Sequence, residues 1–229
     1  MARLTPIRIA LLMATIFVWS SGVWAQNPQL QTKNGRRFPT VVFSCAFWNA
    51  NPAWYSIAVD STGSATYQAT PDTVEQTGVP YTVVFQTSDA TRRVTFNIVQ
   101  ELNYLNGDFP ASAGSPQKTP VRTLVYHDIT YNNQITYSDS TDSEIQELTS
   151  VFEEISATFE FARRLSYFHQ HDKTGLEPEL VRMQTSAEHH LLRELQAVTP
   201  ALRSIVSDAS LSESVRKHAE AILALVRKI

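Results

Sequence analysis

Cysteine is almost absent from this sequence, because Cys45 is the only one in 229 residues. A single thiol excludes an intrachain disulfide framework and a zinc site built from four cysteines. Glycine is also scarce, at seven residues, and the phosphate-binding loops G-x-x-x-x-G-K-[ST] and G-x-G-x-x-G do not occur. The formal net charge of −3 argues against binding to nucleic-acid phosphates. We therefore expect no cofactor and no nucleic-acid partner.

Recognisable catalytic motifs are lacking as well. The G-x-S-x-G motif, which places a nucleophilic serine on a sharp turn between a strand and a helix, does not occur. Acidic residues are common, and a pair such as Asp60 and Asp128 would suit glycoside hydrolysis if the fold brought the two side chains together. We expect a non-enzymatic protein. A secreted hydrolase with a carboxylate site or a His–acid site stays open as the alternative.

Long apolar runs are confined to the N-terminus. Arg3 and Arg8 supply positive charge before an apolar run over residues 9–19, and Val23-Trp24-Ala25 follows this run. A run of this length is typical of a secretory signal peptide and is too short for a membrane span. We predict cleavage before Gln26, which changes the formal net charge from −3 to −5 because two arginines and no acid are removed. The expected location is the periplasm or the extracellular medium, with no transmembrane span after cleavage.

Composition divides the remaining chain into parts. Residues 26–37 are polar and predict a flexible leader. Residues 26–140 hold 15 charged residues in 115, whereas residues 141–229 hold 24 in 89. The first part is rich in strand-forming Thr, Val, Tyr and Phe, and the second in helix-forming residues. We expect a β-rich part with one helix at 38–140, and a helical part at 141–229 that packs on it.

Alternating apolar residues predict three strands early in the β-rich part. A turn at residues 60–63, with Gly63 in the left-handed conformation, joins the first two. Ser88 or Asp89 then begins a helix, and two strands near residues 121–131 and 134–138 follow, turned by Asn132-Asn133. The strands are marked by Tyr55, Ile57 and Val59, by Ala65, Tyr67 and Ala69, and by Tyr81, Val83 and Phe85.

The helical part opens with a long amphipathic helix. Thr141-x-x-Glu144 is a capping box at its start. Its apolar stripe consists of Ile145, Leu148, Phe152, Ile155, Phe159 and Ala162. We expect the sheet on one side of this helix and later helices on the other. A second helix from Leu176 extends to Leu195, a short one follows Thr199-Pro200, and Ser210-x-x-Glu213 caps the last.

Two tryptophans are the candidate binding residues. Trp48 and Trp54 flank the loop of residues 49–53, and a loop bordered by aromatic side chains is a common contact surface. Tyr55 and Tyr67 belong to the core by alternation, and so does Cys45, whose neighbours are apolar. A protein, a peptide or a glycan is the expected kind of partner, and the oligomeric state stays open.

The histidines do not predict a metal site. His169 and His171 lie two residues apart on a helix, where their side chains point about 200° apart. Helical zinc pairs use the spacing i, i+4 instead. We interpret these histidines as a helix end, where partial positive charge is favourable.

A resemblance supports export. Residues 55–67 read Y-S-I-A-V-D-S-T-G-S-A-T-Y, a strand, a turn with Asp60 and Gly63, and a second strand. This pattern resembles a hairpin found in uncharacterised exported bacterial proteins. The resemblance implies a bacterial envelope setting and supplies no activity or binding residues. We expect an α+β fold, an antiparallel sheet packed against helices and followed by a C-terminal helical subdomain, in an exported binding or envelope-associated protein.

Overall fold

The computed structural model describes residues 38–48, 50–70, 80–109, 111–112 and 119–227. All of them belong to the same structural unit, Gln31–Ile229. The predicted signal peptide at residues 1–25 and the predicted leader at residues 26–37 lie outside the described residues. Export and cleavage therefore stay predictions.

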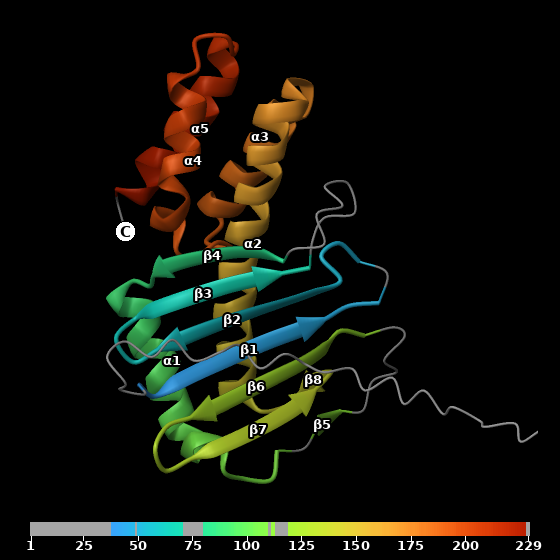
Figure 1. Cartoon of the computed structure of the whole chain (residues 1–229), viewed down its shortest axis with the longest axis vertical. Helices are drawn as coiled ribbons and strands as arrows, with labels where there is room; N and C mark the ends of the chain where they lie inside the picture. Colours follow the sequence, from blue (N-terminus) through green and yellow to red (C-terminus); the bar gives the residue numbers. More distant parts are fainter. Residues whose placement is uncertain (1–37, 49, 71–79, 110, 113–118, 228–229) are drawn as a thin grey trace, which may run out of the picture. The chain divides into compact units, whose positions relative to one another are not determined.

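A six-stranded antiparallel sheet is the main layer (Figure 1). Its strands lie in the order β4-β3-β2-β1-β6-β7, so that β2 and β1 form the centre. A short antiparallel pair joins β5 to β8. The sheet and its helices confirm the predicted α+β class. The strand bounds are β1 (Thr40–Ala46), β2 (Trp54–Asp60), β3 (Ser64–Ala69), β4 (Tyr81–Gln86), β5 (Ala111–Ser112), β6 (Val121–His127), β7 (Asn132–Tyr137) and β8 (Asp139–Ser140).

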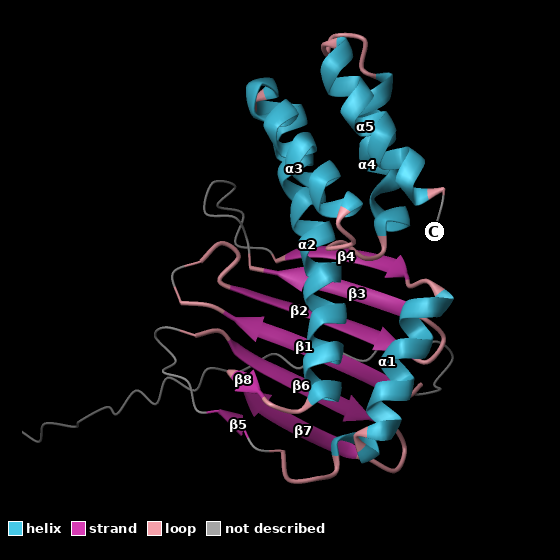
Figure 2. Cartoon of the chain, turned by 180° about the vertical axis from the view of Figure 1, so that it is seen from behind, coloured by secondary structure: helices cyan, strands magenta, loops and turns pink. Residues whose placement is uncertain are grey.

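Alternation along the strands decides which face of the sheet is buried, because successive side chains point to opposite faces. Tyr55, Ile57 and Val59 of β2 are buried, as predicted, and Tyr67 lies beside Ile57 on β3. We call this the inner face. The helices α1 (Asp89–Glu101) and α2 (Ser143–His171) both lie over it (Figure 2).

The turn between β2 and β3 has the predicted chemistry. The Asp60 carboxylate accepts hydrogen bonds from the backbone N–H groups of Thr62 at 2.8 Å and Ser64 at 3.0 Å. Gly63 has φ +86°, a left-handed conformation that residues with a side chain rarely adopt. The predicted glycine turn is therefore confirmed.

The predicted turn at Asn132-Asn133 is wrong, because both residues lie in β7. The chain turns at residues 128–131 instead. Oδ1 of Asp128 accepts from the backbone N–H groups of Thr130 at 2.6 Å and Tyr131 at 2.7 Å. An aspartate side chain can stabilise a turn in this way without glycine or proline, which is why the pair of asparagines was the stronger signal in the sequence.

Three further α-helices follow α2 in the described chain. In both views α3, α4 and α5 gather beyond β4, around the second half of α2 (Figures 1 and 2). They are α3 (Leu176–Glu188), α4 (Thr199–Ser207) and α5 (Glu213–Val226), and short 3-10 turns lie at Asn103–Leu105, Lys173–Gly175 and Leu195–Val198.

Helix α2 provides the core that both parts share. Every member of its predicted apolar stripe is buried. Phe152 stacks on Phe43 of β1 with ring centroids 5.2 Å apart, and Phe159 stacks on Tyr67 of β3 at 5.1 Å. Toward its C-terminal end the same helix contacts α3 and α4. The expectation of partners on two sides of this helix is confirmed.

Two predicted helix caps are displaced by one or two residues. Asp142 rather than Thr141 caps α2, since its carboxylate accepts from the Ile145 N–H at 3.0 Å. Ser212 rather than Ser210 caps α5 through the Val215 N–H at 3.3 Å. Asp, Ser and Thr are all good N-caps, so neighbouring candidates compete and the backbone direction decides between them.

Helix α3 ends earlier than predicted. The prediction carried it through Leu191 to Leu195, but it ends at Glu188, and Leu191 is 59% exposed. His190 at φ 58° and Glu194 at φ 63° take left-handed conformations that a right-handed helix does not allow. The break lets Glu194 reach helix α1, as described below.

None of the helices in the described part of the chain is both long and apolar enough to cross a lipid bilayer.

Candidate functional site

The sheet has a second face, on which none of the described helices packs (Figure 1). We call it the outer face. It consists of the even-numbered residues of β1, β2, β3, β4 and β7 and the odd-numbered residues of β6. Its middle row crosses all six strands through Val84, Thr66, Ala58, Val42, Val125 and Gln134.

The side chains of the outer face are short, mostly uncharged and accessible toward the sheet edges. Exposure is highest on the outer strands β4 and β7, and Val84 is 60% exposed. At the centre Val42 and Ser56 are buried, and Ser44 and Ala58 are partly buried. Thr, Ser, Val, Ala and Gln account for most of the face. Such side chains make a flat surface.

Charge is nearly missing from the outer face. Asp60 is its one charged side chain among the described residues, and it lies at the end of β2, where it holds the turn. A solvated protein surface normally carries many charged side chains of both signs. The face therefore differs from the rest of this chain, whose helical part holds 24 charged residues in 89.

The two candidate tryptophans lie at one end of the outer face. Trp54 belongs to the face itself, opposite Ala46 of β1, and is half-buried. Trp48 lies in the loop after β1 and is 69% exposed. Two backbone contacts fix the base of this loop: the Phe47 N–H donates to the Ala53 carbonyl at 2.8 Å, and the Ala53 N–H donates to the Thr70 hydroxyl at 2.9 Å.

The other aromatic residues of the described strands lie on the inner face. Tyr55 and Tyr67 are buried there, as predicted from alternation. Burial raises the pKa of both phenols, and the charge of Glu160 adds to this effect for Tyr67. Among the described strand residues Trp54 is the only Phe, Tyr or Trp on the outer face.

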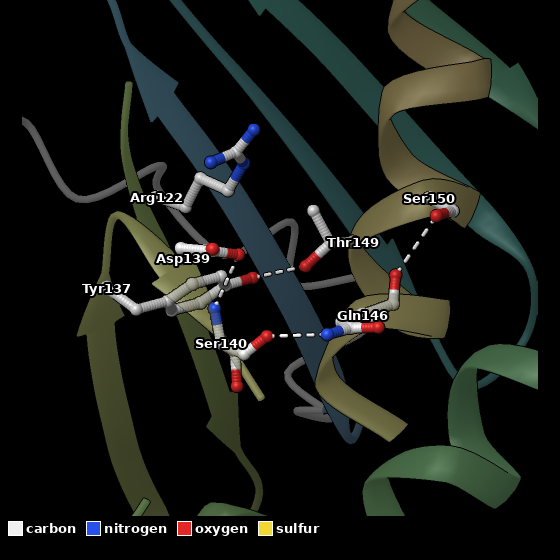
Figure 3. Close-up of a pocket in the computed structure, with 7 residues that line it drawn as sticks. All are labelled: Arg122, Tyr137, Asp139, Ser140, Gln146, Thr149 and Ser150. Atoms are coloured by element: carbon white, nitrogen blue, oxygen red, sulfur yellow. Dashed lines mark hydrogen bonds between the residues drawn. The ribbon is translucent and has the colours of Figure 1, made fainter. Parts of the chain in front are cut away.

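A small polar pocket lies elsewhere, between the end of β7 and the first turns of α2 (Figure 3). Its volume is about 260 Å³. It is lined by Arg122, Tyr137, Asp139, Ser140, Gln146, Thr149 and Ser150. Ligand pockets for drug-sized molecules are usually larger, from about 300 to 1,000 Å³.

The polar groups of this pocket are largely bonded to each other. The Tyr137 hydroxyl meets that of Thr149, and the Gln146 amide donates to the Ser140 carbonyl at 2.6 Å (Figure 3). Arg122 donates from Nε to Glu153 at 2.8 Å and from Nη1 to the Ser138 carbonyl. Burial lowers the pKa of Arg122, but the hydrogen bond and charge of Glu153 outweigh it, so the guanidinium stays charged. These hydrogen bonds connect the end of the sheet to α2, so the pocket is a weaker candidate binding site than the outer face.

Cys45 lies on the inner face and is fully buried, which confirms the expected core position. Burial raises the pKa of its thiol to about 11. The reactive form of cysteine is the thiolate, so this thiol is inert as a nucleophile in the folded protein.

His169 lies in a structural contact at the end of α2. Nε2 of His169 is 3.0 Å from Oδ2 of Asp208, which also accepts from Lys173 at 3.1 Å and so joins the end of α2 to the loop before α5. Hydrogen bonds from Ser210, together with those from His169 and Lys173, hold the pKa of Asp208 well below its usual value. No group of three His, Cys, Asp or Glu side chains in the described ranges is placed to hold a metal ion.

Asp60 and Asp128, the carboxylates considered for glycoside hydrolysis, serve separate turns. Asp60 stabilises the turn after β2. Asp128 accepts from two backbone N–H groups and from the Tyr126 hydroxyl at 2.7 Å, and these bonds lower its pKa. Each carboxylate therefore accepts hydrogen bonds within its own turn.

Buried charges are the feature that sequence analysis missed. Glu160 and Arg163 are only 7% and 8% exposed and form an ion pair at 2.7 Å, while the Tyr67 hydroxyl donates to Glu160 at 2.6 Å. Glu179 is fully buried and bonds to Arg164 and Arg182. These contacts tie α2 to the sheet and to α3.

Comparisons with known proteins do not assign this chain to a family. No protein-family model matches this sequence, and a search of curated proteins finds no match.

Proposed function

We propose that this chain is an exported, non-enzymatic binding protein of the bacterial envelope, periplasmic or secreted, that binds its partner through the outer face. The near absence of charge across six strands carries this proposal. The cores of protein interfaces are depleted of charged residues, whereas a surface that only meets water has no need of such depletion. Trp54 belongs to this surface, and the exposed Trp48 lies in the loop beside it.

The proposal also rests on the sequence features that predict export. The signal peptide predicted at residues 1–25 and the hairpin pattern at residues 55–67 both suit an envelope protein. A partner in that compartment would be a protein, a peptide or a glycan. An anionic partner suits the outer face poorly, because its described residues include no lysine or arginine.

The alternative of a secreted hydrolase has weaker support. It requires a His–acid pair or two acids that face a substrate cavity. The His169–Asp208 pair is the nearest approach to this, but Lys173 and Ser210 bind the same carboxylate. In a catalytic His–acid pair the acid serves to orient the histidine, whereas Asp208 also binds Lys173 and Ser210 and so holds the loop before α5 against the end of α2.

Photo-crosslinking tests the proposal. A photoreactive amino acid is placed at Thr66 on the outer face or, as the control, at Asn97 on the exposed side of α1. Irradiation of cells that export the protein should give discrete adducts at Thr66 and none of the same size at Asn97. The proposal fails if both positions give the same adducts, or if Thr66 gives none while the protein is folded and exported.

A further inference from the structure

The polar pocket between β7 and α2 lies on the inner side of the sheet, away from the outer face (Figure 3). Tyr137 and Thr149 are buried parts of its lining, whereas Asp139, Gln146 and Ser150 are exposed, so the pocket is open to solvent. Its volume of about 260 Å³ is below the range of about 300 to 1,000 Å³ that is usual for drug-sized ligands. A molecule of the size of an amino acid is therefore the kind of ligand that it can hold.

Three polar atoms of the pocket lining have no hydrogen-bond partner among the described residues. They are Nη2 of Arg122, Oδ2 of Asp139 and Oε1 of Gln146. The other polar atoms of these three side chains form hydrogen bonds within the protein, and these bonds fix the side chains. Each side chain is thus held at one atom and can bind a ligand through another.

The two charged groups that line the pocket have opposite signs. The Arg122 guanidinium is always charged and only donates hydrogen bonds, whereas the Asp139 carboxylate only accepts them when it is ionised. Nη1 of Arg122 donates to the Ser138 carbonyl at 2.6 Å, and Ser138 directly precedes Asp139, so both charges lie at the same end of β7. A guanidinium binds carboxylates well, and a carboxylate binds ammonium groups, because both kinds of hydrogen bond are strengthened by charge.

Other classes of ligand fit this lining less well. A phosphate would meet a single guanidinium, with the carboxylates of Asp139 and Glu153 beside it. A divalent cation would lie near Arg122, and no group of three His, Cys, Asp or Glu side chains in the described part of the chain is placed to hold one. An apolar molecule would remove the three polar atoms from water without replacing their hydrogen bonds, which is unfavourable.

We propose that this pocket binds a small zwitterion, a molecule that carries an ammonium and a carboxylate group close together, as a free amino acid does. The ligand carboxylate accepts from Nη2 of Arg122. The ligand ammonium donates to Oδ2 of Asp139 and Oε1 of Gln146. The pocket adds a small-molecule ligand to the proposed function and does not depend on it, since the outer face takes no part in this site.

Calorimetric titration with ligands that lack one charge tests the pairing. The purified protein is titrated with each of the twenty amino acids of proteins, and at least one should bind with a Kd below about 1 mM. The amide of that amino acid lacks the carboxylate, and its N-acetyl derivative lacks the ammonium. Each derivative should bind at least about 10-fold more weakly, because each loses a hydrogen bond between charged groups.

Variants of the lining locate the site. Asp139→Asn changes an exposed side chain without changing its size, and Arg122→Gln removes the guanidinium; each should weaken binding at least about 10-fold. Arg92→Gln is the matched control, because it removes a partly exposed arginine on α1 that does not line the pocket, and it should leave the Kd unchanged. Circular dichroism checks folding. If Arg122→Gln does not fold, Asp139→Asn and Gln146→Ala decide.

Three results would overturn the inference. The first is that none of the twenty amino acids binds with a Kd below about 1 mM. The second is that the amide or the N-acetyl derivative binds within about 10-fold of its parent, since the two charges would then not be what the pocket recognises. The third is that folded variants of Asp139 and Gln146 bind like the wild type, because the ligand would then lie elsewhere.

Discussion

Replacement of Glu160 by glutamine should strongly destabilise the protein. Oε1 of Glu160 accepts from the Tyr67 hydroxyl at 2.6 Å, and Oε2 accepts from Arg163 at 3.1 Å from Nε and 2.7 Å from Nη2. Glu160→Gln keeps the size of the side chain but removes its charge. The guanidinium of Arg163 then stays buried beside α2 and loses its ion pair with the Glu160 carboxylate.

The magnitude follows from the burial of both partners. Removal of one member of a buried ion pair costs about 3 to 5 kcal/mol of unfolding free energy. We expect about 3 kcal/mol, because the glutamine amide oxygen can still accept one hydrogen bond. In a chain of this size that corresponds to a fall in Tm of about 6 to 12 °C. Tyr67→Phe, which removes one hydrogen bond to a charged group, should cost about 1.5 to 3 kcal/mol.

Urea unfolding followed by circular dichroism measures both values. The matched control is the triple variant Tyr67→Phe, Glu160→Leu, Arg163→Met, which replaces all three polar side chains by apolar ones of similar size. Its stability should lie within about 1 kcal/mol of the wild type, since apolar replacement of a buried ion pair is often neutral. A cost below about 1 kcal/mol for Glu160→Gln would refute the reasoning. A triple variant as unstable as the single one would also refute it.

Four further predictions concern the thiol, the leader and two contacts of the C-terminal part. Cys45 should react with iodoacetamide at least about 100-fold more slowly in the folded protein than in urea, because its pKa is raised to about 11 and less thiolate forms; similar rates would contradict this. The mature protein should begin at Gln26, as N-terminal sequencing of the exported form would show. Glu194→Ala should cost about 2 kcal/mol, since the buried carboxylate accepts from the N–H of Ser88 at 2.8 Å and from its hydroxyl at 2.9 Å; a Tm equal to that of the wild type would oppose it. The pKa of Asp208 is lowered in the folded state, so its contribution is present above about pH 4 and is lost as the pH falls further; the difference in Tm between the wild type and Asp208→Asn should therefore shrink toward pH 3.

The spacing of apolar residues predicted the helices and most strands of the fold, but it did not predict where all of them end. The stripe from Ile145 to Ala162 determines the buried side of α2, because only one face of a helix can meet the sheet. The end of α3 was predicted too late, since Leu191 continues the periodic pattern although it is exposed. The helix stops where Glu194 turns toward the first residues of α1, and that contact joins residues 106 positions apart in the chain. Local pattern carries no information about such a partner.

The spacing of charged residues likewise does not predict which ion pairs form. A spacing of four residues along a helix would pair Glu160 with Arg164 and Glu213 with Lys217. The second pair forms at 2.7 Å, whereas Glu160 turns to Arg163 and Arg164 bonds to Glu179. Spacings of three and four residues are equally close on a helix surface. The choice depends on which side of α2 meets the sheet and which meets α3, and only the assembled fold decides this.

The outer face was hidden in the sequence for a different reason. Each strand except β2 shows two or three outward Thr, Ser, Val or Gln residues, which is ordinary for a strand. The strand order brings these short sets together into one uncharged surface. Folding does not require this, because outward positions tolerate lysine or glutamate, and edge strands often carry lysine to prevent association with other chains. Neither β4 nor β7 has a lysine. The outer face therefore stays uncharged out to both described edges, a property that only the strand order makes visible.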